Sequence, residues 1–342
     1  MSAVTILGAG VAGLCVAAEL MSRGVSVRMI DPAGPVNTHS CSWWAGGMLS
    51  PECEGAVAEQ PVVEHGRKAA DWWQKQGAQF GQDVNRNGTM VVALGRDQSE
   101  LTTFARRAEG VEWLDREGIA LHEPHLAEQF GKVLFIANEA HLNPRPMLTG
   151  LHAHLVASGV EFLTAGETLG QVIDCRGLAA QDRLSDLRGV KGEMLIVRCP
   201  DVSLSRPVRL LHPRFPLYIV PRGDGVFMLG ATQIESGQRS RASLRSVMEL
   251  MNAAYALHPA FGEAELLEIG VDARPAFADN QPRIRHFDDR IMVNGLYRHG
   301  YLLAPALAGM VADLVTCGTQ PALWYENCQN TKIAHKTPGR TT

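Results

Sequence analysis

The stretch Val-Thr-Ile-Leu-Gly-Ala-Gly-Val-Ala-Gly, residues 4–13, decides how the chain begins to fold. It reads as an apolar strand that runs into the pattern GxGxxG. Residues 14–23 are rich in helix formers, and a second apolar strand, 25–30, ends on Asp31. The order strand, glycine turn, helix, strand and acid is that of a complete βαβ nucleotide-binding unit.

Each key residue type in this unit has a physical task in binding a dinucleotide. Gly8 permits the tight turn, Gly10 lets the backbone approach a pyrophosphate, and Gly13 allows the helix to pack closely on the strand. The helix N-terminus attracts the phosphates. Asp31 lies 23 residues after Gly8 and is placed to bind ribose hydroxyls. The unit predicts an adenine dinucleotide and leaves NAD and FAD as alternatives.

The composition indicates a globular protein and argues against several classes of partner. The chain has 342 residues, 46% hydrophobic and 20% charged, which suits one large or two medium globular domains. A net charge of -4 argues against nucleic acid or an anionic membrane as partner. Seven cysteines without CxxC spacing fit a reducing compartment, and we expect no metal site.

The ends and the apolar runs predict a cytoplasmic protein. The first strand begins at Ala3 or Val4, which leaves no room for a signal peptide. No apolar run approaches the length needed to span a membrane. We therefore expect no membrane span.

The order of expected elements predicts a nucleotide-binding domain in several pieces with a β-rich domain inserted. Expected helices cover 14–23, 57–76, 99–109, 147–158, 242–257 and 305–317. Expected strands cover 89–94, 133–137, 160–163, 171–175, 191–198, 217–221, 225–230 and 291–294. The predicted domains are 1–80, 142–188 and 270–330 for the nucleotide, 81–141 and 189–269 for the substrate, and a polar tail at 331–342.

Two stretches near the C-terminus are candidates for chemistry. Residues 295–306 place small residues before Pro305, which predicts a helix N-terminus with proline at its first position. Such a terminus would stabilise the negative charge of a reduced flavin, and the alternative is a structural loop-to-helix junction. Arg274, just before Pro275, is either paired within the fold or reserved for a carboxylate ligand.

Two further stretches are open to both functional and structural interpretations. Tyr218 lies in a strand whose neighbours face the other side, so its hydroxyl either points into a pocket or belongs to a buried core tyrosine. Glycines in the loop 42–49 could let a ring system lie against backbone, or the loop is an ordinary one. The twelve histidines show no metal or triad pattern.

These stretches together resemble the FAD-dependent D-amino-acid oxidase superfamily, in particular the ThiO-type glycine oxidases. The resemblance runs from Gly8 to about Leu314. It is carried by Ser-Trp-Trp-Ala-Gly-Gly-Met-Leu-Ser-Pro at 42–51 with Cys-Glu at 53–54, Tyr-Ile-Val-Pro-Arg at 218–222, Gly-Ala-Thr at 230–232, Ala-Arg-Pro at 273–275 and Tyr-Arg-His-Gly-Tyr-Leu-Leu-Ala-Pro at 297–305. It implies an α/β fold, with a Rossmann-like FAD-binding domain and an inserted antiparallel β-sheet plus helices that binds the substrate.

The resemblance also implies roles for individual residues. Arg274 pairs with the substrate carboxylate, Tyr218 hydrogen-bonds the same group, and Arg298 shapes the active site. Gln233 and Met48 line the substrate pocket. The residues expected around FAD are Gly8, Gly10, Val11, Ala12, Gly13, Asp31, Ser42, Ala45, Gly46, Gly47, Met48, Gly177, Arg274, Arg298, His299, Gly300, Tyr301, Leu302 and Leu303.

The implied reaction is oxidation of glycine, sarcosine or a small D-amino acid by hydride transfer to flavin N5. It gives a 2-oxo acid, ammonia and, with molecular oxygen, hydrogen peroxide, for thiamine biosynthesis. FAD is expected to be non-covalent, because no residue matches a covalent attachment point, and the enzyme is expected to form a homo-oligomer, a dimer or tetramer. The alternatives are a flavin dehydrogenase with another electron acceptor, a flavoprotein sensor without turnover, and, least favoured, an NAD-dependent dehydrogenase.

Overall fold

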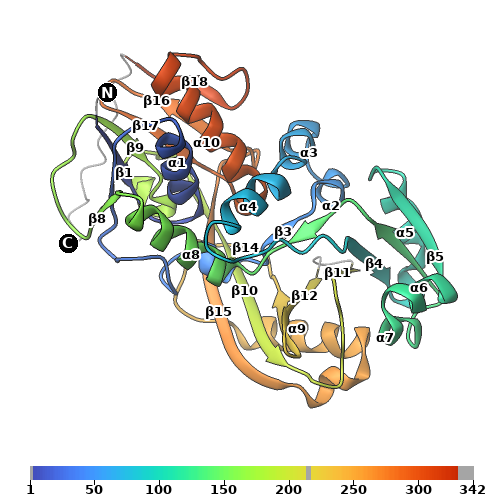
Figure 1. Ribbon diagram of the computed structural model, residues 1–342. Helices are drawn as coiled ribbons and strands as arrows, with labels where there is room; N and C mark the ends of the chain where they lie inside the picture. Colours follow the sequence, from blue (N-terminus) through green and yellow to red (C-terminus); the bar gives the residue numbers. More distant parts are fainter. Residues whose placement is uncertain (1–2, 213–216, 330–342) are drawn as a thin grey trace.

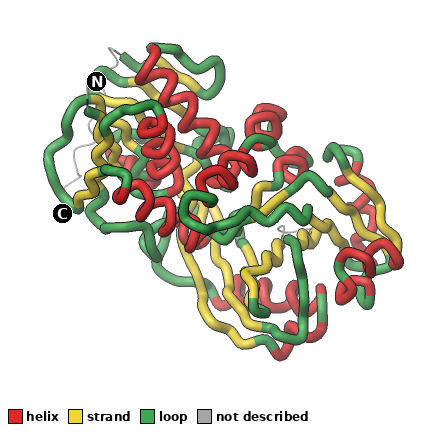
Figure 2. The backbone as a smooth tube through the Cα atoms, viewed as in Figure 1, coloured by secondary structure: helices red, strands yellow, loops and turns green. Residues whose placement is uncertain are grey.

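The computed structural model describes residues 3–212 and 217–329, and the predicted tail at 331–342 lies outside them. Two large sheets lie in two lobes, which Figures 1 and 2 show at the upper left and lower right of the view. The chain crosses between the lobes several times, so segments far apart in sequence meet between them. The fold is the expected α/β combination of a parallel and an antiparallel sheet.

The first sheet contains the glycine turn. Its strands, in spatial order, are β18 (Tyr325–Asn327), β16 (Arg283–His286), β17 (Arg290–Asn294), β9 (Gln171–Asp174), β1 (Val4–Leu7), β2 (Val27–Ile30) and β8 (Glu161–Leu163). All neighbouring pairs are parallel except β16 with β17. Helices α1 (Val11–Ser22), α8 (Pro144–Ala157) and α10 (Gly300–Cys317) share one apolar core with it.

The second sheet is mostly antiparallel. Its strands, in spatial order, are β14 (Ile234–Glu235), β10 (Arg188–Arg198), β13 (Val226–Gly230), β12 (Leu217–Gly223), β11 (Val208–Leu211), β4 (Thr89–Ala93), β6 (Lys132–Ile136) and β5 (Val111–Asp115), with β15 (Glu265–Ala276) also paired to β10. Helix α9 (Leu244–Leu257) covers one face (Figure 1). Strand β15 crosses the predicted domain boundary at 269/270, because its register on β10 runs without a break from Ala276 to Glu268.

The smaller elements bridge the lobes. A two-stranded sheet joins β3 (Met48–Leu49) to β7 (Ala140–His141). The remaining helices are α2 (Pro51–Gly55), α3 (Gln60–Gly66), α4 (Ala69–Gly77), α5 (Gln98–Ala105), α6 (Arg116–His122) and α7 (Pro124–Ala127). The prediction of a single helix over 57–76 is therefore wrong, because α3 ends at Gly66 and a separate helix, α4, follows. A Cβ at Gly66 would lie 2.8 Å from Cγ of Leu302 in α10.

Helix α10 also corrects two expectations from the sequence. It begins at Gly300, so Pro305 lies inside its first turns and not at its first position. Pro305 lacks an N–H for the carbonyl of Tyr301, and the indole Nε1 of Trp73 donates to that oxygen instead, at 2.8 Å. With 18 residues, α10 is long and apolar enough to cross a membrane by length and composition, contrary to the expectation, but more than half of it is buried inside the protein, as in a core helix.

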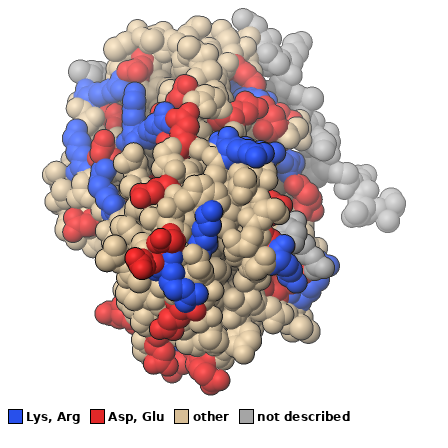
Figure 3. All heavy atoms as spheres, turned by 90° about the vertical axis from the view of Figure 1, so that its right-hand side faces the viewer, with Lys and Arg blue, Asp and Glu red and all other residues tan. Residues whose placement is uncertain are grey.

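The surface carries charges of both signs. On the face shown in Figure 3, acidic and basic side chains are interspersed among uncharged residues. Many arginines are paired, such as Arg285 with Asp186 and Glu326. That face therefore lacks the single-sign field that steers binding to nucleic acid.

Candidate active site

The glycine turn has the geometry that a pyrophosphate requires. Gly8 has φ +95°, and a Cβ there would lie 2.8 Å from the carbonyl oxygen of Cys175 in the next strand segment. A Cβ at Gly13 would overlap the carbonyl oxygen of Gly8, so only glycine lets α1 approach β1 this closely. The amide of Val11, in the first turn of α1, donates to Ser42 Oγ at 3.1 Å.

Asp31 links two loops at the end of β2. Its Oδ2 accepts a hydrogen bond from the amide of Ala9 at 2.8 Å, and its Oδ1 accepts one from the amide of Ala33 at 3.0 Å. Carboxylate oxygens have further lone pairs beyond these two bonds, so the side chain is able to bind ribose hydroxyls as well. The acid therefore orders the glycine turn in addition to facing the cavity.

A cavity of about 570 Å³ begins at this turn and extends between the two lobes. It lies beyond the carboxyl ends of β1, β2, β9 and β17, where open parallel sheets bind their ligands. All the predicted site residues line it except Gly13 and Leu303. Gly13 is buried between α1 and β1, and the amide of Leu303 donates to the carbonyl of His299 within the helix, so its backbone is not available to a cofactor.

The loop 45–48 is held from behind by a buried arginine. Arg222, at the end of β12, donates to the carbonyl oxygens of Ala45, Gly46 and Leu142 at 2.9–3.2 Å. Since successive C=O and N–H groups of a trans peptide point in opposite directions, the amides of Gly46 and Gly47 point away from Arg222. Burial lowers the pKa of Arg222 to about 10. The sequence motif contained Arg222 but gave it no role.

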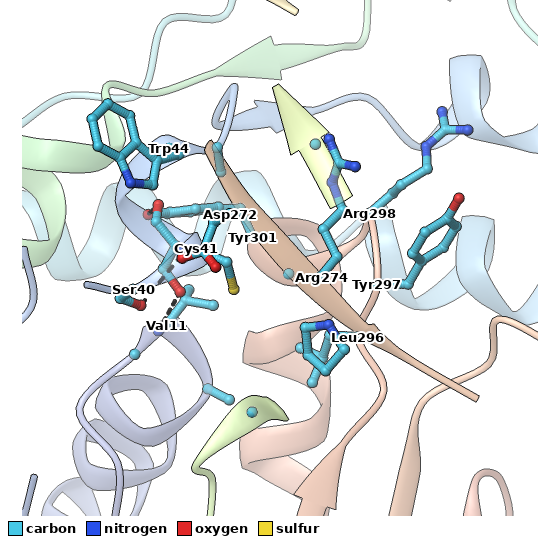
Figure 4. Close-up of a pocket in the computed structure, with 18 of the residues that line it drawn as sticks. Val11, Ser40, Cys41, Trp44, Asp272, Arg274, Leu296, Tyr297, Arg298 and Tyr301 are labelled. Carbon is cyan, nitrogen blue, oxygen red and sulfur yellow. Dashed lines mark hydrogen bonds between the residues drawn. The ribbon is translucent and has the colours of Figure 1, made fainter. Parts of the chain in front are cut away.

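Arg274 lies in the cavity wall without a carboxylate partner. Among the described residues no Asp or Glu oxygen lies within 4.0 Å of it, and its Nη1 donates to the carbonyl of Thr232 at 3.2 Å. Figure 4 shows Arg274 and Arg298 extending in the same direction, with the Tyr297 ring beside them. Burial, and then the charge of Arg298, lower the pKa of Arg274. The structure therefore does not show the ion pair within the fold that the sequence left open as the alternative for Arg274.

Gly192 makes room for that guanidinium. It lies on β10 beside Asp272 of β15, and a Cβ at this position would lie 2.6 Å from Cζ of Arg274. A side chain at position 192 would therefore displace the guanidinium. The sequence offered no sign of this contact, because Gly192 and Arg274 are 82 positions apart.

Glu54 forms a buried cluster with Tyr218, Arg298 and His299. Arg298 Nη2 donates to its two oxygens at 3.1 and 3.2 Å, His299 Nε2 contacts Oε2 at 3.0 Å, and the Tyr218 hydroxyl donates to Oε1 at 3.3 Å. Burial would raise the pKa of Glu54, but Arg298 and His299 hold it well below its usual range. Glu54 is therefore a carboxylate, and the sequence reasoning gave it no role.

A second buried carboxyl supports the short helix that carries Glu54. Glu139, 1% exposed, accepts a hydrogen bond from the amide of Cys53 at 2.6 Å. Its other oxygen has no partner among the residues that the structure describes. Burial raises the pKa of Glu139 to about 7. The Glu139 carboxyl, which is partly protonated near neutral pH, thus holds helix α2 through the amide of Cys53.

One wall of the cavity is apolar. Tyr218 and Val220 of β12 pack with Met194, Ile196 and Met228, while Leu217 and Ile219 belong to the core on the other face, as the alternation predicts. Of the two predicted pocket residues, Met48 packs against this wall and Gln233 lies exposed at the rim. There, Oε1 of Gln233 accepts a hydrogen bond from the Tyr297 hydroxyl at 3.2 Å.

A cavity that connects a pyrophosphate turn to an arginine without a carboxylate partner among the described residues is organised as in a dinucleotide-dependent oxidoreductase. The sequence model of the FAD-dependent oxidoreductase family matches residues 3–314, and the chain belongs to that family. FAD is accordingly the cofactor, which decides between the two dinucleotides that the glycine turn left open.

Individual relatives agree with this membership. The chain is 52% identical, over 93% of its own length and 98% of the relative's, to a Rhizobium etli protein described as a thiamine biosynthesis oxidoreductase, ThiO. It is 24% identical to a glycine oxidase of Bacillus licheniformis, over 94% of this chain and 95% of that one. The crystal structure of glycine oxidase from Geobacillus kaustophilus matches with a TM-score of 0.80 at 23% identity, covering 100% of this chain and 99% of that one.

Proposed function

We propose that this enzyme oxidises glycine or another small amino acid, such as sarcosine or a small D-amino acid. With glycine, water and oxygen the products are glyoxylate, ammonia and hydrogen peroxide. The observation that carries the proposal is that Arg274 has no carboxylate partner among the described residues and lies in the wall of a cavity that begins at the glycine turn. A half-buried cation without such a partner is a site for an anion, and the planar guanidinium suits a carboxylate.

The residues around the cavity suit FAD and a substrate placed beside it. When bound, FAD accepts the two electrons and the hydrogen removed from the substrate carbon. The N–H groups in the first turn of α10 and those of Gly46 and Gly47 would favour negative charge at the flavin edge. No general base is required among the side chains, since the neutral amine of the substrate supplies the electron pair. Arg274 orients the substrate.

The apolar wall supports a small substrate. Met48, Met194 and Met228 pack together in one apolar wall of the cavity, and a Cβ at Gly230 would already lie 2.7 Å from Cε of Met228. A long side chain on the substrate would have to displace this wall. We therefore favour glycine, sarcosine and small D-amino acids, as the sequence resemblance implies.

Three finer points belong to the proposal. Thiamine biosynthesis is supported by the 52% identical relative from Rhizobium etli. Non-covalent FAD, a cytoplasmic location and a dimer or tetramer stay predictions. A dehydrogenase that passes electrons to another acceptor is the second candidate, and peroxide formation distinguishes it from an oxidase.

The first experiment is an absorbance spectrum of the purified protein before and after glycine is added without oxygen. Bleaching of the flavin bands supports the proposal, whereas bands that persist with glycine, sarcosine and D-alanine contradict it. Arg274→Ala is expected to keep FAD and to weaken binding of these substrates by about 10² or more. Arg198→Ala, which removes an exposed arginine of β10 paired with Glu265, is the matched control.

A further inference from the structure

Four arginines line the cavity, and of these only Arg274 has no carboxylate partner among the described residues. Arg298 donates to both oxygens of Glu54, whereas Arg274 meets the carbonyl of Thr232 alone. Their side chains extend in the same direction (Figure 4). The charge of Arg298 contributes to the lowered pKa of Arg274. Arg274 therefore carries the one uncompensated positive charge among the four cavity arginines that the structure describes.

Glu54 also accepts a hydrogen bond from the Tyr218 hydroxyl, which would otherwise be available to the substrate. Tyr218 is 5% exposed, and its O–H donates to Glu54 Oε1 at 3.3 Å. The guanidinium of Arg209 lies over the same tyrosine ring, 5.3 Å from its centroid, and donates to the carbonyl of Cys53 at 2.7 Å. A donor that is engaged by one carboxylate is not available to a second. Glu54 thus accepts hydrogen bonds from Arg298 and Tyr218, the two strongest donors near Arg274.

We propose that Glu54 is a specificity-determining residue that limits the site to amino acids with a single carboxylate. By neutralising Arg298 and engaging Tyr218, it leaves Arg274 as the remaining anchor for an anion among the described residues. A substrate with a second carboxylate would bring that group toward a buried negative charge, which is repulsive. This inference rests on the proposed function, because it assumes that Arg274 binds the substrate carboxylate.

Removing the charge of Glu54 should reverse the preference for substrates with a single carboxylate. In Glu54→Gln, Arg298 and the nearby Arg209 lose their anion and Tyr218 regains a free hydroxyl. A second substrate carboxylate then meets an uncompensated cation and a donor at the place where it was repelled. The carboxamide oxygen of glutamine still accepts hydrogen bonds, whereas its NH2 group only donates, so one of the two acceptors of the cluster is kept.

The test compares sarcosine with iminodiacetate, which is sarcosine with a carboxylate added to its N-methyl carbon. For each variant, kcat and KM are measured with both substrates. Glu54→Gln is expected to raise the ratio of kcat/KM for iminodiacetate to that for sarcosine by about tenfold or more, mainly through KM. Glu54→Asp keeps the charge and should preserve the wild-type ratio. In Glu54→Gln/Arg298→Met the gain should disappear.

Binding of carboxylates that are not oxidised provides a second measurement. Its result would not change if Glu54 had only a structural role. Acetate and malonate are titrated against the oxidised enzyme, and the change in flavin absorbance gives both dissociation constants. We expect Glu54→Gln to favour malonate relative to acetate by a similar factor. Unchanged ratios in a Glu54→Gln enzyme that holds FAD and oxidises sarcosine overturn the inference.

A reverse variant covers the case in which Glu54→Gln yields no flavoprotein. Arg298→Met leaves Glu54 charged beside the cavity, in contact with His299 and Tyr218 but without its guanidinium partner, so kcat/KM should fall about tenfold more for iminodiacetate than for sarcosine. Equal losses for the two substrates would contradict the inference. If wild-type enzyme binds neither acetate nor malonate and is not reduced by sarcosine or glycine, the proposed function itself fails.

Discussion

Gly192→Ala tests the placement of Arg274 without removing any charge. The added Cβ would lie 2.6 Å from Cζ of Arg274, whereas carbon atoms in contact are about 3.5 Å apart. The guanidinium must therefore move by about 1 Å. Since Gly192 does not have a positive φ, alanine fits the backbone of β10, and the perturbation is confined to the arginine.

The expected loss follows from this displacement. A misplacement of about 1 Å in a positioning group costs on the order of 10² in rate. We expect kcat/KM for glycine or sarcosine to fall by about 10², while the FAD content stays that of the wild type. The loss should be larger than that of Gly131→Ala, where an added Cβ meets no heavy atom within 4 Å.

Anaerobic reduction of the flavin, followed by stopped-flow absorbance at several substrate concentrations, separates binding from the chemical step. A displaced anchor should weaken substrate binding and slow the limiting rate together. If Gly192→Ala matches Gly131→Ala in both quantities, Arg274 does not hold the substrate in the orientation that reacts. The reasoning from the Gly192 contact would then be refuted.

Three other changes have defined outcomes. Between pH 4.5 and 7 the unfolded chain releases the Glu139 proton and the folded chain keeps it, so stability falls as pH rises through this window. In urea unfolding, Glu139→Gln should therefore gain about 3 kcal/mol relative to wild type from pH 4.5 to 7 and no more above it, and a difference independent of pH would contradict this. Trp73→Phe leaves the Tyr301 carbonyl without its donor and should lower the free energy of unfolding by about 1–3 kcal/mol, again measured in urea; no loss would mean that another group satisfies the oxygen. Arg222→Met frees three carbonyl oxygens behind loop 45–48 and should weaken FAD binding about tenfold or more in a fluorescence titration of apoprotein, whereas unchanged affinity would show that the loop holds itself.

The local parts of the fold were predictable because their signals lie within a few residues. The glycine turn and the alternation of β12 each follow from side-chain size and period, and both are present in the structure. The start of α10 was not predictable in this way. Proline usually marks a first helical position, and only the distant Trp73 makes Pro305 tolerable inside the helix.

The candidate site was predicted in part. Arg274, Arg298 and Tyr218 were located by a resemblance of motifs, and they do lie along one cavity. Glu54 and Gly192 were given no role, because an acid after a cysteine and a glycine in a strand have no distinctive spacing. Their importance arises from contacts across 82 to 244 positions of sequence, which no local pattern contains.

The glycine turn and the start of α10 are made at very different times. Gly8 and Gly300 both line the cavity, and at roughly 5–20 residues per second the ribosome reaches the second about 15 s to a minute after the first. During that interval the nascent chain has the pyrophosphate turn but lacks the helix that completes the opposite side. The cofactor must therefore be taken up late, once α10 has docked on α1, and the free FAD concentration at that moment determines how much of the newly made enzyme becomes active.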